Sequence, residues 1–500
     1  MIPIFKIKTK EKRDFDAIVV GSGPNGLAAA ITLQQAGLSV LLVEGKDTIG
    51  GGLRSAELTL SGFTHDICSA IHPLAVASPF FKTLPLGDFG LEFITPPISA
   101  AHPFDDETAA FLTKSYKKTA FLLDDDEKTY LKLIEPIVKN WDEILNDSLA
   151  PLHFPKNPWA MAQFGLRALP PATHIAKLFK TEQAKGLWAG MAAHAIQPLS
   201  NWATSAIGLM LLAAGHTAEG WAIPQGGSQQ IANALGAYFE SIGGTIETEF
   251  YVTSLSDLPS AHAVVFDITP RQLLEIAGYR FSSIYKWQLE RYRYGMGVFK
   301  VDWAIEGQIP FTAKECLQAG TVHIGGSFDE IAAAEKETSK GKIVENPFVL
   351  LAQQSVFDST RAPEGKNTVW AYCHVPHGST IDRTEAIERQ IERFAPGFRE
   401  RILAKHSFNT AEMEDYNPNY IGGDINGGVI DIRQLFTRPA LRYSPYRTSA
   451  KGLYICSSST PPGGGVHGMC GFHAAQRVLK DVFKGKIDPV FDTHLGNIKV

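Results

Sequence analysis

A glycine-rich turn near the start of the chain constrains its fold most. Residues 17–20 form an apolar run with the length and β-branched content of a buried parallel strand. The run ends at Gly21, Gly23 and Gly26, which have the spacing G-x-G-x-x-G and open an alanine-rich stretch with helical character. In this pattern glycine permits a tight turn, close approach of the backbone to a pyrophosphate, and close packing of helix on strand. The turn therefore predicts an α/β unit that binds a dinucleotide.

The residues after this turn supply the rest of a nucleotide site. A second apolar run, residues 39–43, ends at Glu44, where a carboxylate is expected to accept hydrogen bonds from ribose hydroxyls. The N–H groups at the start of the intervening helix would face the phosphates. A glycine turn alone also occurs in unrelated α/β units, but strand, helix, strand and acid in this order favour nucleotide binding.

Length and composition exclude several classes of protein. A chain of 500 residues exceeds the usual size of one core, which predicts two or more domains. The net charge of -5 leaves no basic surplus for nucleic acid. Five cysteines without a C-x-x-C pair argue against a disulfide framework or a zinc site and suit a reducing compartment. Residues 1–13 lack the apolar core of a secretory signal. We therefore expect a cytoplasmic protein.

The pattern along the chain predicts an α/β fold in which the nucleotide-binding domain is interrupted twice. Its parts are expected at residues 1–100, 220–275 and 446–485, with a strand also suggested by alternation around Val252. The inserted α+β substrate domain would comprise a helical part, residues 101–219, and an antiparallel-sheet part, residues 276–445. Residues 486–500 are expected to form a tail.

The helical part contains many aromatic, leucine and alanine residues. These side chains could line an apolar cavity or simply pack helices together. Residues 152–178 also combine Trp, Phe and Leu with Lys156, Arg167 and Lys177, which makes peripheral contact with a membrane surface a further option. The longest apolar stretch, residues 203–215, is too short to span a bilayer.

Three stretches resemble the phytoene desaturase-related FAD-dependent oxidoreductases, in particular the subgroup of mitochondrial pyridine nucleotide-disulphide oxidoreductase domain-containing proteins. They are residues 16–66 with the glycine turn and the Gly62-Phe63-x-x-Asp66 element, residues 224–252, and GLYICSSSTPPGGGVHGMCGFHAA in residues 452–475. NPNYIGGDINGG, residues 417–428, is similar to the same subgroup. The resemblance implies a Rossmann-type FAD domain of the three-layer ββα, glutathione-reductase-like kind.

The resemblance also implies the residues that hold FAD. The turn and Glu44 would bind the ADP half, Val252 the adenine through its backbone, and residues 465–469 the isoalloxazine. The full set is Gly21, Ser22, Gly23, Pro24, Asn25, Gly26, Glu44, Gly45, Gly51, Gly52, Leu53, Arg54, Val252, Gly465, Val466, His467, Gly468 and Met469.

Three departures from the family pattern bear on function. The family's G-G-R has Gly52 in place of arginine, with Arg54 two residues later, so an arginine–phosphate contact is not assured. Its T-H-P corresponds to residues 460–462 here, and its G-I-P-G to residues 465–468. These changes point away from a carotenoid desaturase and toward an oxidoreductase acting on another substrate.

The expected reaction is hydride transfer from an apolar, isoprenoid-like or lipid-like substrate to flavin N5, because FAD supplies the chemistry and needs no acid–base cluster. His467 is the expected catalytic residue, as a group that tunes the flavin, although a histidine bonded only to backbone is equally compatible. Amine oxidation, double-bond isomerisation with reduced flavin, and a non-catalytic FAD-containing interaction protein remain alternatives. Without a second nucleotide fingerprint or a dithiol, oxygen or a quinone is the preferred electron acceptor.

Other polar residues give weaker signals. His374 and His377 are three apart at a probable strand end, so they do not share a face and predict no metal site. Tyr372, His374 or Tyr420 could line the substrate cavity, although plain packing is the simpler interpretation.

Overall fold

The nucleotide half of the molecule is built on a five-stranded parallel sheet. The computed structural model describes residues 13–484, and the predicted tail, residues 486–500, lies outside them. The sheet has the order β16-β10-β1-β2-β9, and all its neighbouring pairs are parallel. Its strands are β1 (Phe15–Val20), β2 (Val40–Val43), β9 (Thr245–Glu247), β10 (Ala261–Phe266) and β16 (Leu453–Ile455). One sheet thus unites three distant stretches of sequence.

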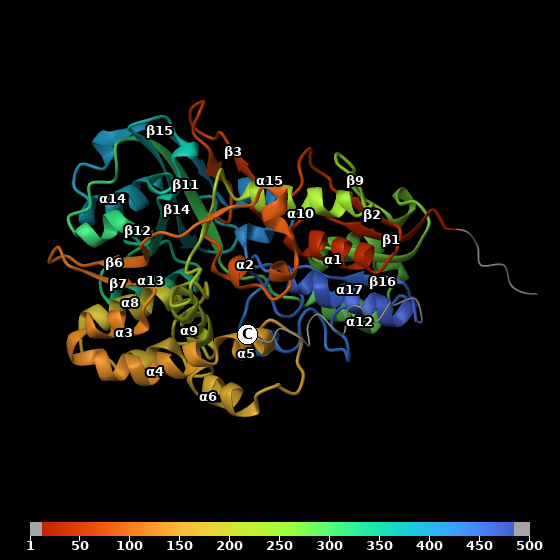
Figure 1. The fold of residues 1–500 in the computed structure, drawn as a ribbon, viewed down its shortest axis with the longest axis horizontal. Helices are drawn as coiled ribbons and strands as arrows, with labels where there is room; N and C mark the ends of the chain where they lie inside the picture. The colour runs from red at the N-terminus through yellow and green to blue at the C-terminus, as the bar shows by residue number, and fades with distance from the viewer. Residues whose placement is uncertain (1–12, 485–500) are drawn as a thin grey trace, which may run out of the picture.

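Helices cover both faces of this sheet (Figure 1). Ala17, Val19 and Leu42 belong to the core shared with α1 (Pro24–Gln35), α10 (Gln229–Ser241) and α17 (Met469–Val482). Ile18 and Leu41 pack instead with α11 (Pro270–Ala277) and α12 (Ser283–Glu290). The second face is therefore covered by helices where the ββα expectation placed strands. No strand forms around Val252, because this segment leaves the sheet after β9 and lines a cavity.

The second half is built on a seven-stranded sheet of order β15-β11-β14-β13-β12-β6-β7. Its pairs are antiparallel except β12 with β6. The strands are β6 (Ile98–Pro103), β7 (Ala109–Leu112), β11 (Gly297–Glu306), β12 (Ala319–Ile324), β13 (Val349–Ala352), β14 (Lys366–Val375) and β15 (Ile402–Phe408). Since β6 and β7 belong to this sheet, the substrate domain begins near residue 98, and its first part is not only helical.

The two faces of the seven-stranded sheet differ in composition. Phe299, Val301 and Trp303 of β11 lie in an apolar core with α14 (Thr384–Phe394). Because side chains alternate along a strand, Lys300 and Asp302 lie on the opposite face. That face is turned toward the nucleotide half, and it also carries Tyr372 and Trp370 of β14, which pair with Lys300 and Asp302.

The remaining helices form a layer at the lower left of Figure 1 and short connecting pieces. The layer contains α3 (Tyr116–Phe121), α4 (Glu127–Lys139), α5 (Trp141–Ser148), α6 (Pro158–Ala168), α7 (Ala172–Ala176), α8 (Glu182–Ala193) and α9 (Thr204–Gly215). The connecting pieces are α2 (Pro73–Ala77), α13 (Phe328–Thr338), α15 (Thr410–Tyr416), α16 (Ile432–Leu435), β3 (Ser55–Ala56) with β4 (His65–Asp66), and β5 (Phe93–Ile94) with β8 (Ile223–Pro224).

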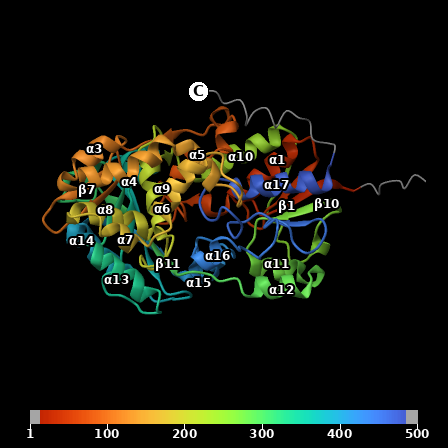
Figure 2. The ribbon, with the colours of Figure 1, turned by 90° about the horizontal axis from the view of Figure 1, so that it is seen from below.

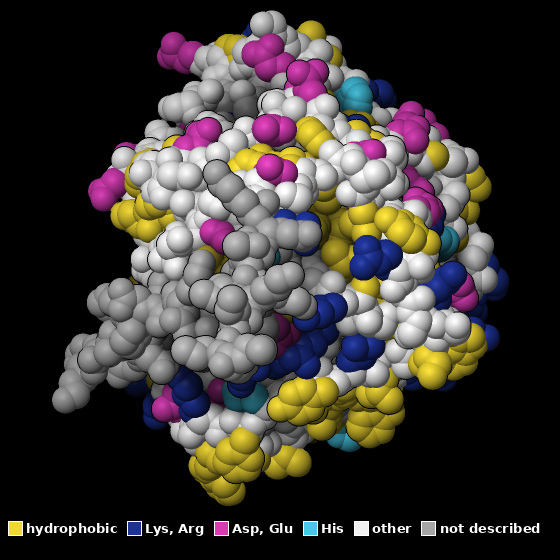
Figure 3. All heavy atoms as spheres, turned by 90° about the vertical axis from the view of Figure 1, so that its right-hand side faces the viewer, with side chains coloured by type: hydrophobic (Ala, Val, Ile, Leu, Met, Phe, Trp, Pro, Cys, Tyr) yellow, Lys and Arg dark blue, Asp and Glu magenta, His cyan; other side chains and the backbone are white. Residues whose placement is uncertain are grey.

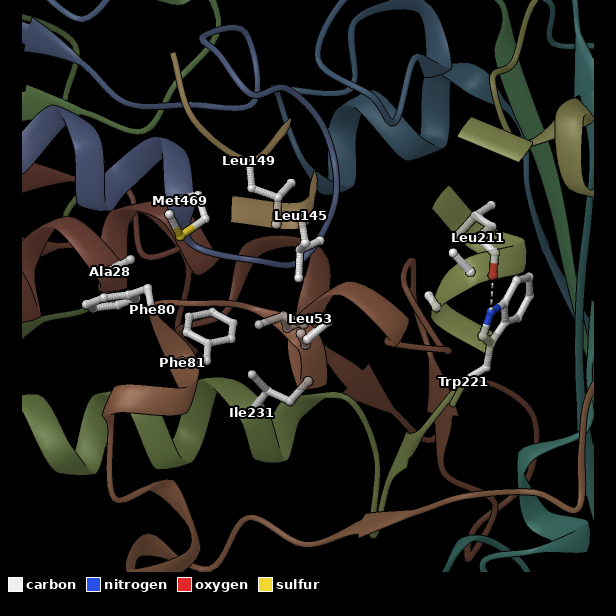
Figure 4. Close-up of a cluster of buried hydrophobic side chains, with 14 of the residues drawn as sticks. Ala28, Leu53, Phe80, Phe81, Leu145, Leu149, Leu211, Trp221, Ile231 and Met469 are labelled. Atoms are coloured by element: carbon white, nitrogen blue, oxygen red, sulfur yellow. Dashed lines mark hydrogen bonds between the residues drawn. The ribbon is translucent and has the colours of Figure 1, made fainter. Parts of the chain in front are cut away.

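One continuous core joins these parts. Figure 4 shows members contributed by the glycine-turn helix, by residues 80–81, by α5 and by α17, and the indole of Trp221 donates a hydrogen bond of 3.1 Å to the carbonyl of Leu211. His473 Nε2 lies 3.1 Å from the carbonyl oxygen of Leu149, which ties α17 to the helical layer. The layer is therefore packed against both halves and helps to enclose the space between them.

Candidate functional site: a cavity between two sheets

A cavity of about 510 Å³ runs between the two halves. At one end it meets Val20, Val43 and Asp267, where β1, β2 and β10 finish. Ligands of parallel α/β sheets bind beyond the carboxyl ends of the strands, so this is the nucleotide end. At the other end the walls are Leu350 and Trp370 of the seven-stranded sheet. We call this second part the substrate end.

The glycine turn at the nucleotide end is built by close backbone contacts. Gly21 has φ +96°, and a Cβ on Gly26 would lie 1.9 Å from the carbonyl oxygen of Gly21. A Cβ on Gly23 would lie 2.7 Å from Oδ2 of Asp267. Helix α1 starts directly after Gly23 and has no side-chain cap. Uncapped N–H groups beside glycines are the arrangement that accepts a phosphate, so these residues fit a dinucleotide.

Glu44 organises the nucleotide end through four hydrogen bonds. Its Oε2 accepts from the backbone N–H (3.0 Å) and the hydroxyl (2.5 Å) of Ser22. Its Oε1 accepts from the N–H of Lys46 and from Nη2 of Arg54, both at 3.0 Å. Glu44 lines the cavity as the sequence predicted. Its carboxylate also fixes the glycine turn and the following loop.

Arg54 is buried rather than solvated. Besides its ion pair with Glu44, its Nε and Nη2 donate to the carbonyl of Thr48 at 3.0 and 2.8 Å, and its guanidinium lies 5.7 Å from the ring centre of Tyr416. The side chain lines the cavity. Since Glu44 and Thr48 hold it, Arg54 fixes the position of the Glu44 carboxylate at the cavity.

Asp267, which the sequence analysis did not single out, adjoins the glycine turn. Its Oδ2 accepts a hydrogen bond of 2.8 Å from the N–H of Gly26. Burial raises the pKa of Asp267 to about 7, and the charge of Glu44 adds to the increase, while the bond from Gly26 opposes it. An acid directly after a buried parallel strand was the signal that could have placed it at this edge.

The other residues assigned to the ADP half fall into two groups. Those that line the cavity are Ser22, Pro24, Asn25, Gly45, Gly51, Gly52 and Val252. Gly52 is in close contact with Tyr420, since a Cβ there would lie 2.4 Å from its hydroxyl. Leu53 is fully buried in the core instead (Figure 4). Gly26 also lies outside the lining, and its role is to let α1 pack on the turn.

The C-terminal glycine loop between β16 and α17 reaches the cavity through Ser457, Ser458, Gly465 and Val466. His467 is 1% exposed, its Nδ1 accepts from the N–H of Met469 at 3.0 Å, and its carbonyl accepts from the hydroxyl of Ser78 at 2.6 Å. Burial lowers the pKa of His467 to about 4, so the ring is neutral. The flavin-tuning role expected of His467 gains no support, because its ring shapes the loop and does not face the cavity. Gly468 and Met469 are likewise outside the lining.

The substrate end is walled by residues that are neighbours only in the sheet. Leu350 of β13 pairs with Tyr372 of β14, and both line the cavity together with Thr321 and Trp370. The hydroxyl of Tyr372 forms no hydrogen bond within residues 13–484. Tyr420 also lines the cavity, but His374 does not, because its Nδ1 lies 2.8 Å from Glu335.

Helices close the substrate end from the other side. His194, Leu211 and Trp221 line it. Nε2 of His194 lies 3.0 Å from Nε2 of His323, and burial lowers the pKa of His194 to about 3, so this pair is neutral. A Cβ on Gly190 of α8 would lie 2.4 Å from Nδ1 of His323. The glycine therefore lets α8 pack directly against the imidazole ring of this sheet residue.

A buried ion pair lies beside the substrate wall, on the same face of the sheet. Lys300 and Asp302 of β11 are bonded to each other, and they pair across the sheet with Tyr372 and Trp370. Burial lowers the pKa of Lys300 and raises that of Asp302 to about 6. Neither residue lines the cavity. Alternation along a strand does not show which of its two faces meets a ligand.

A second buried network joins the two halves. Arg361, which is fully buried, donates from Nη1 to Asp66 at 2.6 Å, from Nε to Asp358 at 3.0 Å and from Nη2 to the carbonyl of Pro224 at 2.9 Å. Asp66 also accepts from the backbone N–H of Ser228 at 2.7 Å. Burial acts to raise the pKa of Asp66, but Arg361 and these hydrogen bonds outweigh it and hold the pKa below its usual value. The family-like residue Asp66 therefore fixes the two halves around the cavity.

Within residues 13–484, a metal site and a membrane-spanning helix are both absent. No group of three or more His, Cys, Asp or Glu side chains is placed to hold a metal ion. None of the described helices combines the length and the hydropathy that crossing a bilayer requires.

Comparison with known proteins agrees with this geometry. Residues 19–84 match the NAD(P)-binding Rossmann-like domain family. The pyridine nucleotide-disulfide oxidoreductase domain-containing protein 2 of Rattus norvegicus is 23% identical over 94% of both chains. The lycopene-forming phytoene desaturase of a Paracoccus species is 22% identical over 93% of this chain and 97% of its own.

Solved structures share the fold. An oxidoreductase from Methanosarcina mazei superposes with a TM-score of 0.63 at 15% identity, over 93% of this chain and 99% of its own. Cyclohexylamine oxidase from Brevibacterium oxydans gives a TM-score of 0.58 at 15% identity, over 94% of this chain and 100% of its own. Since both sequence relatives are matched over nearly their whole length, the chain is similar along its length to the pyridine nucleotide-disulfide oxidoreductase domain-containing proteins and to the phytoene desaturases.

Proposed function

We propose that this protein binds FAD along the cavity and oxidises an apolar, lipid-like substrate by hydride transfer to flavin N5. The observation that carries the proposal is the continuity of the cavity, which joins the glycine turn to the aromatic and aliphatic wall of the seven-stranded sheet. A dinucleotide held by its phosphates at the turn extends from there toward this wall. The charged side chains of the lining, Glu44, Lys46, Arg54, Asp267 and Glu275, lie on the nucleotide side.

The residues expected to bind the cofactor are found among those that line the cavity. Gly21, Ser22, Gly23, Glu44 and Val252 would hold the ADP half, and Gly465 and Val466 would contact the flavin half. When bound, FAD accepts the hydride, and the protein supplies binding, orientation and the exclusion of water. Ser22 and Arg54 hold the carboxylate of Glu44 in place at the cavity through hydrogen bonds. The uncapped start of α1 faces the phosphate region.

The charge of the lining favours an uncharged substrate over an amine. The carboxylates that line the cavity are Glu44, Asp267 and Glu275, which lie on the nucleotide side, at β2, after β10 and on α11. At the substrate end an ammonium group would meet only aromatic faces, such as those of Trp370 and Tyr420. Burying a cation without an anionic partner is costly. The aromatic wall nevertheless keeps amine oxidation as the second candidate, since cation–π contacts offset part of that cost.

The electron acceptor is expected to be oxygen or a quinone. The sequence contains no second dinucleotide fingerprint that would hold a nicotinamide cofactor as well. A small acceptor needs no site of that kind.

The test is the absorbance spectrum of the purified protein, followed anaerobically while lipids, polyenes and amines are added separately. Bleaching of flavin bands by an apolar compound would support the proposal, whereas bleaching by amines alone would replace it with amine oxidation. A substrate that rearranges only after the flavin is reduced would indicate an isomerase. Flavin bands that no compound bleaches would favour the non-catalytic alternative, and protein that cannot take up FAD would exclude the cofactor.

A further inference from the structure

One edge of the helical layer exposes large apolar side chains. Leu152 and Phe154, between α5 and α6, are each 83% exposed, and Trp159 and Leu166 of α6 are 73% and 78% exposed. Leu169 and Trp202 extend the group at 43% and 59%. Isolated exposed apolar residues are ordinary, but contiguous patches mark interaction sites. We call these six residues the α6 patch.

Helix α6 is apolar on both of its sides. Ala160, Phe164 and Ala168 are buried against the helical layer. Trp159 and Leu166 are seven residues apart and therefore lie on one outward-facing stripe. A helix that is hydrophobic all round is normally buried or in contact with lipid. Helix α6 lies at the lower edge of the molecule in Figure 1 and is labelled among the helices of the layer in Figure 2. Trp159 and Leu166 are exposed there.

The segment that carries most of the patch has charges of one sign. Residues 148–181 contain no Asp or Glu, although the whole chain has 52 acidic residues and 47 Lys and Arg. The same segment carries four cations, Lys156, Arg167, Lys177 and Lys180, and none of them forms an ion pair with any residue of the described chain. The nearby carboxylates of α5, Glu143 and Asp147, accept hydrogen bonds from the Asn157 side chain and from the backbone N–H of Lys156. The patch segment therefore carries unpaired positive charge on a protein whose net charge is -5.

A second exposed group belongs to the segment beyond α16. Phe436, Leu441 and Tyr443 are exposed there, and no Asp or Glu occurs in residues 432–480. Gln197 Nε2 donates 2.9 Å to the carbonyl of Ile430, which links the loop before Trp202 to this segment. Figure 3 shows hydrophobic side chains along the lower edge of the molecule with Lys and Arg side chains above them. Apolar and basic groups thus continue along the lower edge.

We propose that the α6 patch docks on the surface of a lipid bilayer with anionic headgroups. Trp and Phe favour the membrane–water interface, Leu side chains enter the acyl boundary, and flanking Lys and Arg contact anionic headgroups. A symmetric dimer through the same surface would instead bring the four cations of one protomer toward the four of the other. Like charges at an interface oppose association. The charge pattern therefore favours lipid over a second copy of the chain.

The patch also lies near a route into the cavity. A hollow of about 430 Å³ beside the loop between α8 and α9 is lined by Ile196 and Asn201, and Ile196 also lines the main cavity. Asn201 directly precedes Trp202 of the patch. If the proposed function holds, a substrate dissolved in the bilayer would reach the substrate end through this hollow. The docking itself does not depend on that reaction.

The test is co-sedimentation of the full chain with phosphatidylcholine vesicles with and without phosphatidylglycerol. The wild type is expected to bind the anionic vesicles, and added salt is expected to weaken binding. The double variant Trp159→Ser/Leu166→Ser should lower the partition coefficient by at least about tenfold. Lys156→Glu/Lys177→Glu should cause a loss on the order of tenfold or more on anionic vesicles only.

The matched control is Leu403→Ser on β15, which is 43% exposed at the opposite edge of the molecule (Figure 1). It should bind vesicles like the wild type. Unchanged circular dichroism in each variant ensures that lost binding is not lost folding. The proposal is overturned if the wild type stays in the supernatant, if Leu403→Ser loses as much binding, or if the α6 double variant only converts a dimer to a monomer. Because vesicle binding needs no turnover, this result is independent of the absorbance test of the reaction.

Discussion

The two ends of the cavity are formed by different parts of the residues, backbone at one end and side chains at the other. The nucleotide end is made by backbone: glycines at fixed spacing, the start of α1 and a carboxylate at the end of β2. The substrate end is made by side chains such as Leu350 and Tyr372, which are 22 residues apart and adjacent only across the sheet. Substitutions that alter the backbone geometry of the glycine turn are hardly tolerated, whereas the side chains that form the substrate wall can be replaced by others. The comparison implies that variants at the two ends should fail in different ways.

The largest expected effect comes from the buried Arg361 network, which joins the two halves of the molecule around the cavity. Arg361→Met should lower the free energy of unfolding by about 3–5 kcal/mol, because it leaves the buried carboxylate of Asp66 without its cation. Urea denaturation measures this loss. Arg399→Met, which removes a solvent-exposed partner of Glu385, is the control and should cost less than about 1 kcal/mol. Similar losses for both variants would show that the buried network does not hold the halves together.

At the nucleotide end, Gly26→Ala should weaken dinucleotide binding on the order of 100-fold. Its Cβ would lie 1.9 Å from the carbonyl oxygen of Gly21, so α1 must move away from the turn. Flavin content after purification and titration with FAD are the measurements. Gly165→Ala in α6 is the control, since nothing lies within 4 Å of its Cβ. Normal FAD affinity in Gly26→Ala would refute the view that backbone packing makes this end.

Asp267 should make the nucleotide end sensitive to pH. Its pKa is raised from 3.8 to about 7 in the folded protein, so the proton is held more tightly than in the unfolded chain. The resulting stabilisation is fully present below pH 3.8 and is lost as the pH rises through about 7. Asp267→Asn keeps an oxygen for the N–H of Gly26 and should abolish this decline in thermal stability.

The same variant should bind FAD more tightly at alkaline pH. Removing a negative charge beside the phosphate region is expected to raise the affinity about tenfold at pH 8. Near pH 5 the variant and the wild type should bind FAD alike. Isothermal titration at the two pH values measures the difference, and a wild-type affinity that does not change with pH would contradict the role given to Asp267.

The smallest effect is expected at the substrate end. Tyr372→Phe removes a hydroxyl that makes no hydrogen bond within residues 13–484, so unfolding free energy should change by less than about 1 kcal/mol. FAD content should stay at the wild-type level, while KM for an identified substrate shifts a few-fold. Steady-state kinetics and the ratio of flavin to protein absorbance measure both. Loss of FAD in this variant would mean that the two ends are not separable.

The features that depend on neighbouring residues in the chain could be predicted from the sequence. The glycine turn and the strands β1 and β2 follow from local pattern, and the position of Glu44 follows from its place after a strand. The sequence prediction failed at Val252, because alternation cannot show that a segment has left the sheet. The flavin-tuning role of His467 stays a prediction, because a histidine in a glycine loop gives no sign of which way its ring points. Asp267 was overlooked although it directly follows a buried parallel strand, as Glu44 does.

The sequence by itself determined the two-domain α/β plan, the dinucleotide turn and the relationship to flavin-dependent oxidoreductases. These depend on backbone requirements that only certain residues at fixed spacing can meet. Only the tertiary structure decided which face of the seven-stranded sheet meets the cavity, that Lys300 and Asp302 lie beside the substrate wall on that face, and that Arg361 joins the halves. Such choices depend on contacts between residues far apart in the chain, and alternation leaves the two faces of a strand equivalent until the whole molecule packs.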